Sequence, residues 1–170
     1  MNKHISRPKI HKKNDEYYTQ NSCWDKITPY INKSQVIFEG FYGGGHTYNY
    51  FTKNGYKVIG QKGLDFFSDE ADKLLKQSDC VITNPPFSLK YKIMDKLVEH
   101  NKPFILVLPL ACINTISFRN CFNNKMNDVS VIIPRGRLKF IQNKEIKKSP
   151  SFESCYVCYK MLNKKLIFLD

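Results

Sequence analysis

Short apolar runs alternate along the chain with longer stretches in which apolar residues recur every three or four positions. The runs are typical of buried strands, and the longer stretches are typical of amphipathic helices. The predicted strands cover residues 36–39, 57–60, 80–83, 104–108, 129–133 and 154–159. The predicted helices cover residues 47–53, 69–77, 90–100 and 117–125. Because crossover helices join parallel strands, the pattern predicts an α/β fold with a mostly parallel sheet.

The two ends of the chain depart from this alternation. Residues 1–14 are basic and lack periodicity, so we expect a flexible arm there. Asn21 or Ser22 is expected to cap a first helix, which should kink or stop early near Pro29. No helix is predicted beyond Pro150, so we expect the sheet to finish with an antiparallel edge strand or hairpin.

Length and charge narrow the class of protein. A chain of 170 residues suits one domain and leaves no room for a second domain of ordinary size. Lys and Arg number 27 against 15 Asp and Glu, which gives a formal net charge of +12. This charge favours nucleic acid as the partner. Lysine-rich codon usage would give the same composition, so charge is supporting information only.

The chain has no apolar run close to the roughly 20 residues that cross a bilayer, and its start lacks the apolar stretch of a signal peptide. We therefore expect an intracellular protein that does not contact membranes. The six cysteines are then expected to be free, buried thiols. Cys155 and Cys158 form a C-x-x-C pair inside a predicted strand with no second pair, so no metal site is expected.

A glycine-rich turn follows the strand predicted over residues 36–39. The turn reads Glu39-Gly40-Phe41-Tyr42-Gly43-Gly44-Gly45-His46. Glycines permit positive φ and let a ligand approach the backbone, and the helix that follows offers unpaired amides at its N-terminus. The turn predicts a site for a nucleotide-like cofactor, and an ordinary flexible loop is the alternative.

The tetrapeptide Asn84-Pro85-Pro86-Phe87 follows the strand predicted over residues 80–83. Ligands bind at the carboxyl ends of strands in open α/β sheets, and two prolines fix the directions of the neighbouring polar groups. An aromatic amine is a poor nucleophile, and two acceptors that hold its hydrogens draw its nitrogen toward tetrahedral geometry. Asn84 and the Pro85 carbonyl would be these acceptors, and Phe87 would stack on the base. A plain Pro-Pro turn capped by a buried Phe87 is the alternative.

These segments resemble the amino-methyltransferases, and most of all the DNA N6-adenine methyltransferases of phages, viruses and bacteria. The Asn-Pro-Pro-Phe motif of that family is matched completely. Its acidic-Pro-Phe-x-Gly-x-Gly turn is matched at Glu39, Phe41, Gly43 and Gly45, with Gly40 in place of the proline. The resemblance implies a Rossmann-like class I methyltransferase fold.

The resemblance also implies S-adenosylmethionine as the cofactor and indicates which residues would hold it. They are Tyr17, Tyr18, Thr19, Glu39, Phe41, Gly43, Gly45, Gln61, Asp65 and Phe66. Residues 15–19 are similar to a family segment near the carboxylate of the cofactor. Residues 65–67 are similar to a family segment that binds the adenine of the cofactor. Gln61 stands where the family usually has an acidic residue for the ribose, which predicts weaker cofactor binding or an inactive relative.

A basic segment is the predicted nucleic-acid contact. Residues 134–140 and 149–152 are similar to segments near the target-base pocket of small viral members of the family. The residues expected to contact nucleic acid are Arg135, Arg137, Lys139 and Phe140, with a merely solvated loop as the alternative. We expect one methyltransferase domain over residues 15–170 without a separate target-recognition domain, so a second subunit would help to select the target.

The sequence predicts transfer of a methyl group from S-adenosylmethionine to the exocyclic amine of a nucleic-acid base, with N6 of adenine in DNA favoured. The predicted catalytic residues are Asn84, Pro85, Pro86 and Phe87. Alternative acceptors are adenine in RNA, including a cap-adjacent one, cytosine N4 and a protein glutamine. A catalytically silent nucleic-acid-binding subunit of the same fold is an alternative of another class. An unrelated nucleotide-binding protein ranks last because no P-loop or dinucleotide fingerprint is present.

Overall fold

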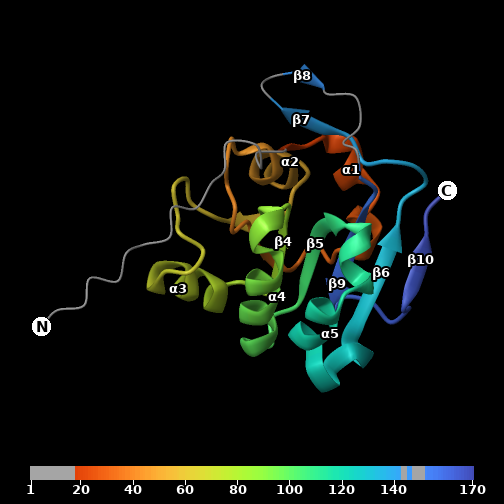
Figure 1. Ribbon diagram of the computed structural model, residues 1–170. Helices are drawn as coiled ribbons and strands as arrows, with labels where there is room; N and C mark the ends of the chain where they lie inside the picture. The colour runs from red at the N-terminus through yellow and green to blue at the C-terminus, as the bar shows by residue number, and fades with distance from the viewer. Residues whose placement is uncertain (1–17, 143–144, 147–151) are drawn as a thin grey trace, which may run out of the picture.

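A computed structural model describes residues 18–142, 145–146 and 152–170. Within these residues, helices cover both faces of a seven-stranded sheet (Figure 1). Its strands are β2 (Val36–Phe38), β3 (Lys57–Ile59), β4 (Cys80–Thr83), β5 (Phe104–Pro109), β6 (Val129–Ile133), β9 (Ser154–Tyr159) and β10 (Leu166–Phe168). Their order in the sheet is β10-β6-β9-β5-β4-β2-β3, and β9 runs antiparallel to both of its neighbours while the other pairs are parallel. The predicted α/β fold with a mostly parallel sheet is confirmed.

The helices also follow the predicted pattern. They are α1 (Asn21–Asp25), α2 (His46–Lys53), α3 (Asp69–Gln77), α4 (Lys90–Glu99) and α5 (Ile116–Phe122), with short 3-10 helices at Thr28–Tyr30, Phe87–Leu89, Leu110–Asn114 and Asn123–Asp128. The first helix does stop early, but Gln20 is its N-cap and not Asn21 or Ser22. The end predicted for α5 was three residues too late, because Asn123 takes a positive φ of 48°.

The predicted antiparallel strand exists, but its predicted position at the sheet edge was wrong. β9 lies between β5 and β6, and all its residues are buried, as expected for an interior strand. The edge is formed by β10, which pairs parallel with β6. Leu166 and Phe168 of β10 are 51% and 72% exposed. The sequence pattern did not indicate β10 as a separate strand.

Two hydrophobic cores lie on the two faces of the sheet. Side chains alternate between the faces along β5, because successive residues of a strand point in opposite directions. Phe104, Leu106 and Leu108 pack in the core under α3, α4 and α5. Ile105 and Val107 pack in the core under α1 and α2. All six cysteines are buried with free thiols, which confirms that prediction.

The strand order reverses between β2 and β4. From β2 the chain passes through α2 to β3 on one side, and then through α3 to β4 on the other side of β2. The two helices cover opposite faces, since α2 packs in one core and α3 in the other. In open α/β sheets, ligands bind outside the carboxyl ends of the strands at such a reversal. Both predicted functional turns begin there.

A second, smaller sheet joins distant parts of the chain. It consists of β1 (Tyr18–Thr19), β7 (Phe140–Gln142) and β8 (Glu145–Ile146), in the order β1-β7-β8 with antiparallel pairing. The labelled β7 and β8 lie at the top of Figure 1. In the part of the chain that the structure describes, no helix is long and apolar enough to cross a membrane.

Candidate functional site

The turn after β2 requires glycine at particular positions. Gly43 and Gly45 have positive φ values of 48° and 78°, and Gly45 is the N-cap of α2. A Cβ atom on Gly43 would lie 2.8 Å from Cε1 of Tyr18. Any larger residue at position 43 would therefore be strained and would displace the Tyr18 ring. The turn presents bare backbone at the start of a helix, as the sequence predicted.

The small sheet brings Tyr18 to this turn. β1 pairs with β7, opposing Tyr18 to Ile141 and Thr19 to Phe140. The Tyr18 ring lies over the glycines, with its centroid 4.8 Å from that of the His46 ring. Thr19 is buried. The predicted cofactor residues Tyr18, Gly43 and Gly45 are thus brought together, while residues 15–17, with Tyr17, fall outside the described residues.

The turn after β4 is fixed by its prolines and by hydrogen bonds. Pro85 is buried, whereas Asn84, Pro86 and Phe87 are half-buried. The Leu89 amide donates to the Pro86 carbonyl over 3.0 Å. The Lys90 ammonium donates to the Phe87 carbonyl, also over 3.0 Å. These bonds hold the predicted catalytic residues in one conformation at the start of α4.

Phe87 has an aromatic neighbour from the far end of the chain. The Phe152 ring packs edge-on against it, with centroids 5.4 Å apart and planes at 82°. Phe152 belongs to the segment that resembles part of a target-base pocket, and residues 149–151 of that segment lie outside the described residues. The contact places Phe152 beside the predicted catalytic turn.

Glu39 links the two turns. Its Oε1 accepts a hydrogen bond from the Phe41 amide over 2.8 Å and a second one from the Thr83 hydroxyl. Thr83 is the last residue of β4 and precedes Asn84 directly. Sequence reasoning missed Thr83, although a hydroxyl residue that ends an otherwise apolar predicted strand, directly before Asn84, was a usable signal.

The environment of Glu39 is unusual for a carboxyl group. The residue is 1% exposed, and its Oε2 has no well-formed hydrogen bond among the described residues. Burial raises the pKa of Glu39 to about 7, although the Thr83 hydroxyl, the Phe41 amide and the Thr47 hydroxyl oppose the shift. A buried polar atom of this kind is suited to a ligand that donates a hydrogen bond.

Phe66 explains the glycine that replaces the family's proline. The Phe66 ring stacks on Phe41, with centroids 4.7 Å apart, and is 3% exposed. A Cβ atom on Gly40 would lie 2.7 Å from Phe66 ring atoms. Glycine at position 40 therefore leaves room for Phe66. The neighbouring Phe67 is 40% exposed, so Phe67 is the more accessible of the two rings.

Asp65 and Gln61 both lie between β3 and α3. Asp65 is exposed, and its Oδ1 accepts a hydrogen bond from the Phe67 amide over 2.9 Å. Gln61 is also exposed and follows Gly60, whose position leaves no space for a Cβ atom because the Glu39 carbonyl would be 2.7 Å away. The carboxyl ends of β2 and β3 therefore approach closely, and Gln61 comes near the glycine turn.

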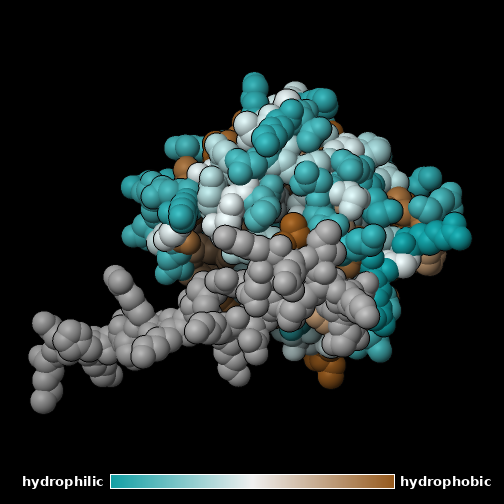
Figure 2. All heavy atoms as spheres, turned by 90° about the horizontal axis from the view of Figure 1, so that it is seen from above, coloured by the Kyte–Doolittle hydropathy of each residue, from teal (hydrophilic) through white to brown (hydrophobic). Residues whose placement is uncertain are grey.

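The structure divides the predicted nucleic-acid contacts. Arg135, Arg137 and Lys139 are exposed, whereas Phe140 is 1% exposed and packs in the core. Phe140 is therefore not placed to contact nucleic acid. Arg137 is paired with Glu153 over 2.8 Å at the surface. Figure 2, viewed from the side on which β7 and β8 lie, shows a mainly hydrophilic surface outside its grey region.

Comparison with known proteins decides the family. Residues 48–150, more than half of the chain, match the family described as adenine-specific methyltransferase EcoRI. The chain belongs to this family. The matched range includes Asp65, the Asn84-Pro85-Pro86-Phe87 turn and the basic segment, and it begins just after the glycine turn.

Relatives of this family member include the Type II methyltransferase M.EcoRI of Escherichia coli, which is 34% identical over 60% of this chain and 31% of its own length. M.MgeORF184P of Mycoplasma genitalium is 48% identical over 34% of this chain and 19% of its own length. M.MpnI of Mycoplasma pneumoniae is 55% identical over 25% of this chain and 13% of its own length. The chain thus spans less than a third of the length of these relatives.

Proposed function

We propose that this family member transfers a methyl group from S-adenosylmethionine to N6 of adenine in DNA. The observation that carries the proposal is the hydrogen-bonded junction of the glycine turn and the Asn84-Pro85-Pro86-Phe87 turn, through Glu39 and Thr83. This junction lies where the strand order reverses. The family description supports adenine as the base, and the net charge of +12 suits a polyanionic substrate.

The residues present fit S-adenosylmethionine. The backbone of Gly43 and Gly45 would hold its methionine part, together with the buried Glu39 carboxyl. Gln61 would take the ribose, and Asp65 with the rings of residues 66 and 67 would take the adenine. When bound, this cofactor supplies an electrophilic methyl group. The residues of the chain would bind and orient the two substrates.

The Asn84 side chain and the Pro85 carbonyl would accept the two hydrogens of the adenine amine. Because both acceptors are fixed by the proline turn, they would hold the nitrogen with its lone pair directed toward the methyl group. Phe87 would stack on the base, and Phe152 would support the Phe87 ring from its edge. After transfer, the nitrogen would release its extra proton to solvent.

The target base must leave the double helix to reach these groups, so we propose that it is flipped out or single-stranded. Arg135 and Lys139 would contact phosphates, and Arg137 would do so after leaving Glu153. Other parts of the site or a second subunit would select the target sequence. A DNA substrate would place the activity inside the cell.

Gln61 favours a second candidate function. A neutral amide makes a weaker hydrogen bond to a ribose hydroxyl than a carboxylate does. The chain would then be a catalytically silent subunit that binds nucleic acid. Retained DNA binding without cofactor binding would identify this second function.

Mass spectrometry of nucleosides tests the proposal. The purified protein is incubated with S-adenosylmethionine and separate pools of single- and double-stranded DNA and RNA. N6-methyladenine in a DNA pool is expected. N6-methyladenine in RNA alone, or N4-methylcytosine, would keep the methyltransferase function and overturn the acceptor. Unmodified pools together with no cofactor binding would favour the silent subunit.

A further inference from the structure

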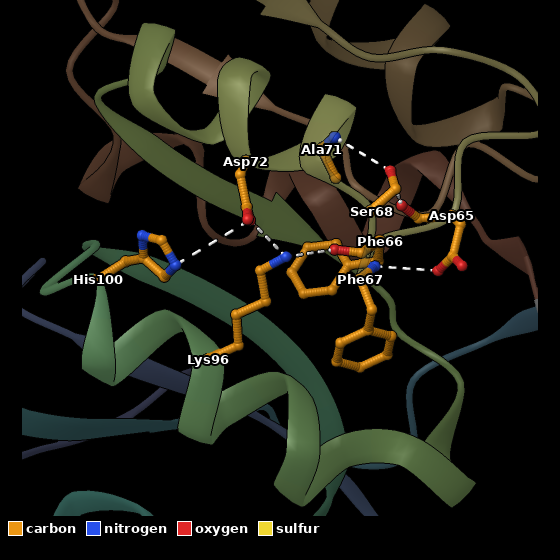
Figure 3. A network of polar contacts seen from close by, with 8 residues as sticks. All are labelled: Asp65, Phe66, Phe67, Ser68, Ala71, Asp72, Lys96 and His100. Carbon is orange, nitrogen blue, oxygen red and sulfur yellow. Dashed lines mark hydrogen bonds and ion pairs between the residues drawn. The ribbon is translucent and has the colours of Figure 1, made fainter. Parts of the chain in front are cut away.

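Lys96 of α4 reaches across to the segment that precedes α3 (Figure 3). Its ammonium donates to the Phe66 carbonyl over 2.7 Å and lies 2.6 Å from Oδ1 of Asp72. Its side chain is only 13% exposed. A lysine ammonium buried to this extent requires partners, and here a backbone carbonyl and a carboxylate provide them.

Two aromatic rings complete the surroundings of Lys96. The ammonium lies 5.1 Å from the centroid of the Phe66 ring and 5.7 Å from that of the Phe67 ring. Both distances are within the range of cation–π attraction. His100 is a second basic group near Asp72, with its Nε2 at 4.0 Å from Oδ1 (Figure 3). The contacts of Lys96 therefore converge on residues 66 and 67 and on the first turns of α3.

The carbonyl that Lys96 holds lies between the two groups predicted to take the adenine. The Asp65 carboxylate precedes this carbonyl and accepts a hydrogen bond from the Phe67 amide. The Asp65 backbone carbonyl accepts a second hydrogen bond from the Ser68 amide. The Ser68 hydroxyl in turn caps α3 at the Ala71 amide. Fixing the Phe66 carbonyl thus restricts the backbone that orients both Asp65 and the exposed Phe67 ring.

We propose that Lys96 is a positioning residue that holds residues 65–67 in the conformation that binds the adenosine part of the cofactor. The proposal rests on the proposed methyltransferase function. α4 begins immediately after the 3-10 helix that Phe87 opens, so Lys96 also connects the helix of the substrate turn to the cofactor segment. The Lys96 side chain would touch neither the cofactor nor the target base.

Calorimetric titration tests the proposal without turnover. S-adenosylhomocysteine and 5′-methylthioadenosine are each titrated into the wild-type protein, Lys96→Met and Lys92→Met. Methionine keeps the apolar stem of lysine and removes its charge and hydrogen bonds. Lys92 is an exposed lysine on the same helix and serves as the control. Lys96→Met should raise the Kd of both ligands about tenfold, which corresponds to about 1.4 kcal/mol.

Kinetics and a conservative variant separate positioning from general stability. Lys96→Met should raise the KM for S-adenosylmethionine about tenfold and leave kcat within about twofold. Lys96→Arg should restore most of the affinity, because a guanidinium also donates to a carbonyl and a carboxylate. If Lys96→Met does not fold, Lys96→Gln replaces it with the same expectation, since its shorter neutral side chain loses the ion pair.

The outcomes distinguish this proposal from the proposed function. Wild-type affinity for both ligands in the folded Lys96 variant would overturn the positioning role and leave the methyltransferase function intact. An equal loss in Lys92→Met would also overturn it, because the loss would then reflect charge alone. Failure of the wild-type protein to bind either ligand would overturn the proposed function itself.

Discussion

The two turns that follow β2 and β4 leave neighbouring strands at the same edge of the sheet, but they are built in opposite ways. The turn after β2 uses glycines with positive φ and presents bare backbone. The turn after β4 uses two prolines and closes itself with hydrogen bonds to the carbonyls of Pro86 and Phe87. The first turn makes space for a ligand, and the second fixes the direction of a few polar groups.

This difference fits two different tasks. A cofactor bound mainly by backbone amides needs close approach, which side chains would block. An amine that must be oriented for reaction needs acceptors that do not move, because small displacements have large effects on rate. Glu39 joins the two turns through Thr83, so the tasks are coupled at one buried carboxyl group.

The largest expected effect comes from the proline turn. Asn84→Ala should lower turnover by at least about 10²- to 10³-fold, as the loss of one preorganised polar group does in other enzymes. Its Kd for S-adenosylhomocysteine should stay within about twofold of the wild-type value, because Asn84 is predicted to face the base. Methyl transfer with labelled cofactor and calorimetry give the two values. Retained turnover would contradict the role of Asn84.

A substitution in the glycine turn should weaken cofactor binding, whereas Asn84→Ala should leave it nearly unchanged. Gly43→Ala adds a Cβ atom 2.8 Å from Tyr18 at a φ of 48°. We expect a Kd for S-adenosylhomocysteine raised about tenfold or more, and a stability loss of about 1 to 2 kcal/mol from the positive φ. Gly55→Ala is the matched control, since Gly55 has a φ of 80° and nothing within 4 Å of its added Cβ. Gly55→Ala should lose similar stability and keep cofactor affinity; a loss of affinity equal to that of Gly43→Ala would refute the crowding argument.

The link between the turns should make stability depend on pH. The folded-state pKa of Glu39 is raised from 4.5 to about 7, so the folded protein binds a proton that the unfolded chain releases. This proton binding stabilises the folded protein fully below pH 4.5, the pKa of Glu39 in the unfolded chain. The stabilisation is lost as the pH rises through about 7, so the free energy of unfolding falls by about 3 kcal/mol in all.

Glu39→Gln isolates this effect. The carbonyl of the introduced amide keeps an acceptor for the Phe41 amide and the Thr83 hydroxyl, but the amide does not titrate. The stability of the variant relative to wild type should therefore rise between about pH 4.5 and about pH 7.5. Urea unfolding across this range measures the difference, and other titrating groups cancel in it. A difference independent of pH would show that the Glu39 carboxyl is ionised throughout.

The smallest expected effect lies outside both turns. Arg135→Ala should weaken DNA binding modestly and reduce the salt dependence of the binding constant by about one unit of slope. Lys57→Ala is the control, because Lys57 is exposed and is the first residue of β3, the strand at the far end of the sheet from β6 and β10. Fluorescence anisotropy at several salt concentrations measures both slopes. Equal slopes for the two variants would indicate that position 135 contacts no phosphate.

The sequence was informative where the structural signal is local. The strands predicted over residues 80–83 and 129–133 agree with β4 and β6, because buried strands are continuous apolar runs bounded by turns. The two turns after β2 and β4 were also predicted, since glycine and proline determine backbone conformation within a few residues. The ends of helices were predicted less accurately, because α5 ends at Phe122 and Asn123 is its C-cap.

Long-range contacts were not predictable from pattern. β1 pairs with β7 over more than a hundred residues, and neither short strand has a period of its own. The pattern of Phe66 and Phe67 gave no reason why the first is buried and the second exposed. Lys96 resembled any solvated lysine on a helix, because only the packing of α4 against residues 66–72 reveals its partners.

A crystal structure with S-adenosylhomocysteine bound would test most directly whether the two turns form one site. We predict the methionine part of the ligand at Gly43 and Gly45, the adenine at residues 65–67, and the ligand sulfur facing the Asn84-Pro85-Pro86-Phe87 turn. A ligand bound away from the carboxyl ends of β2 and β4, or with its sulfur directed away from Asn84, would contradict the account.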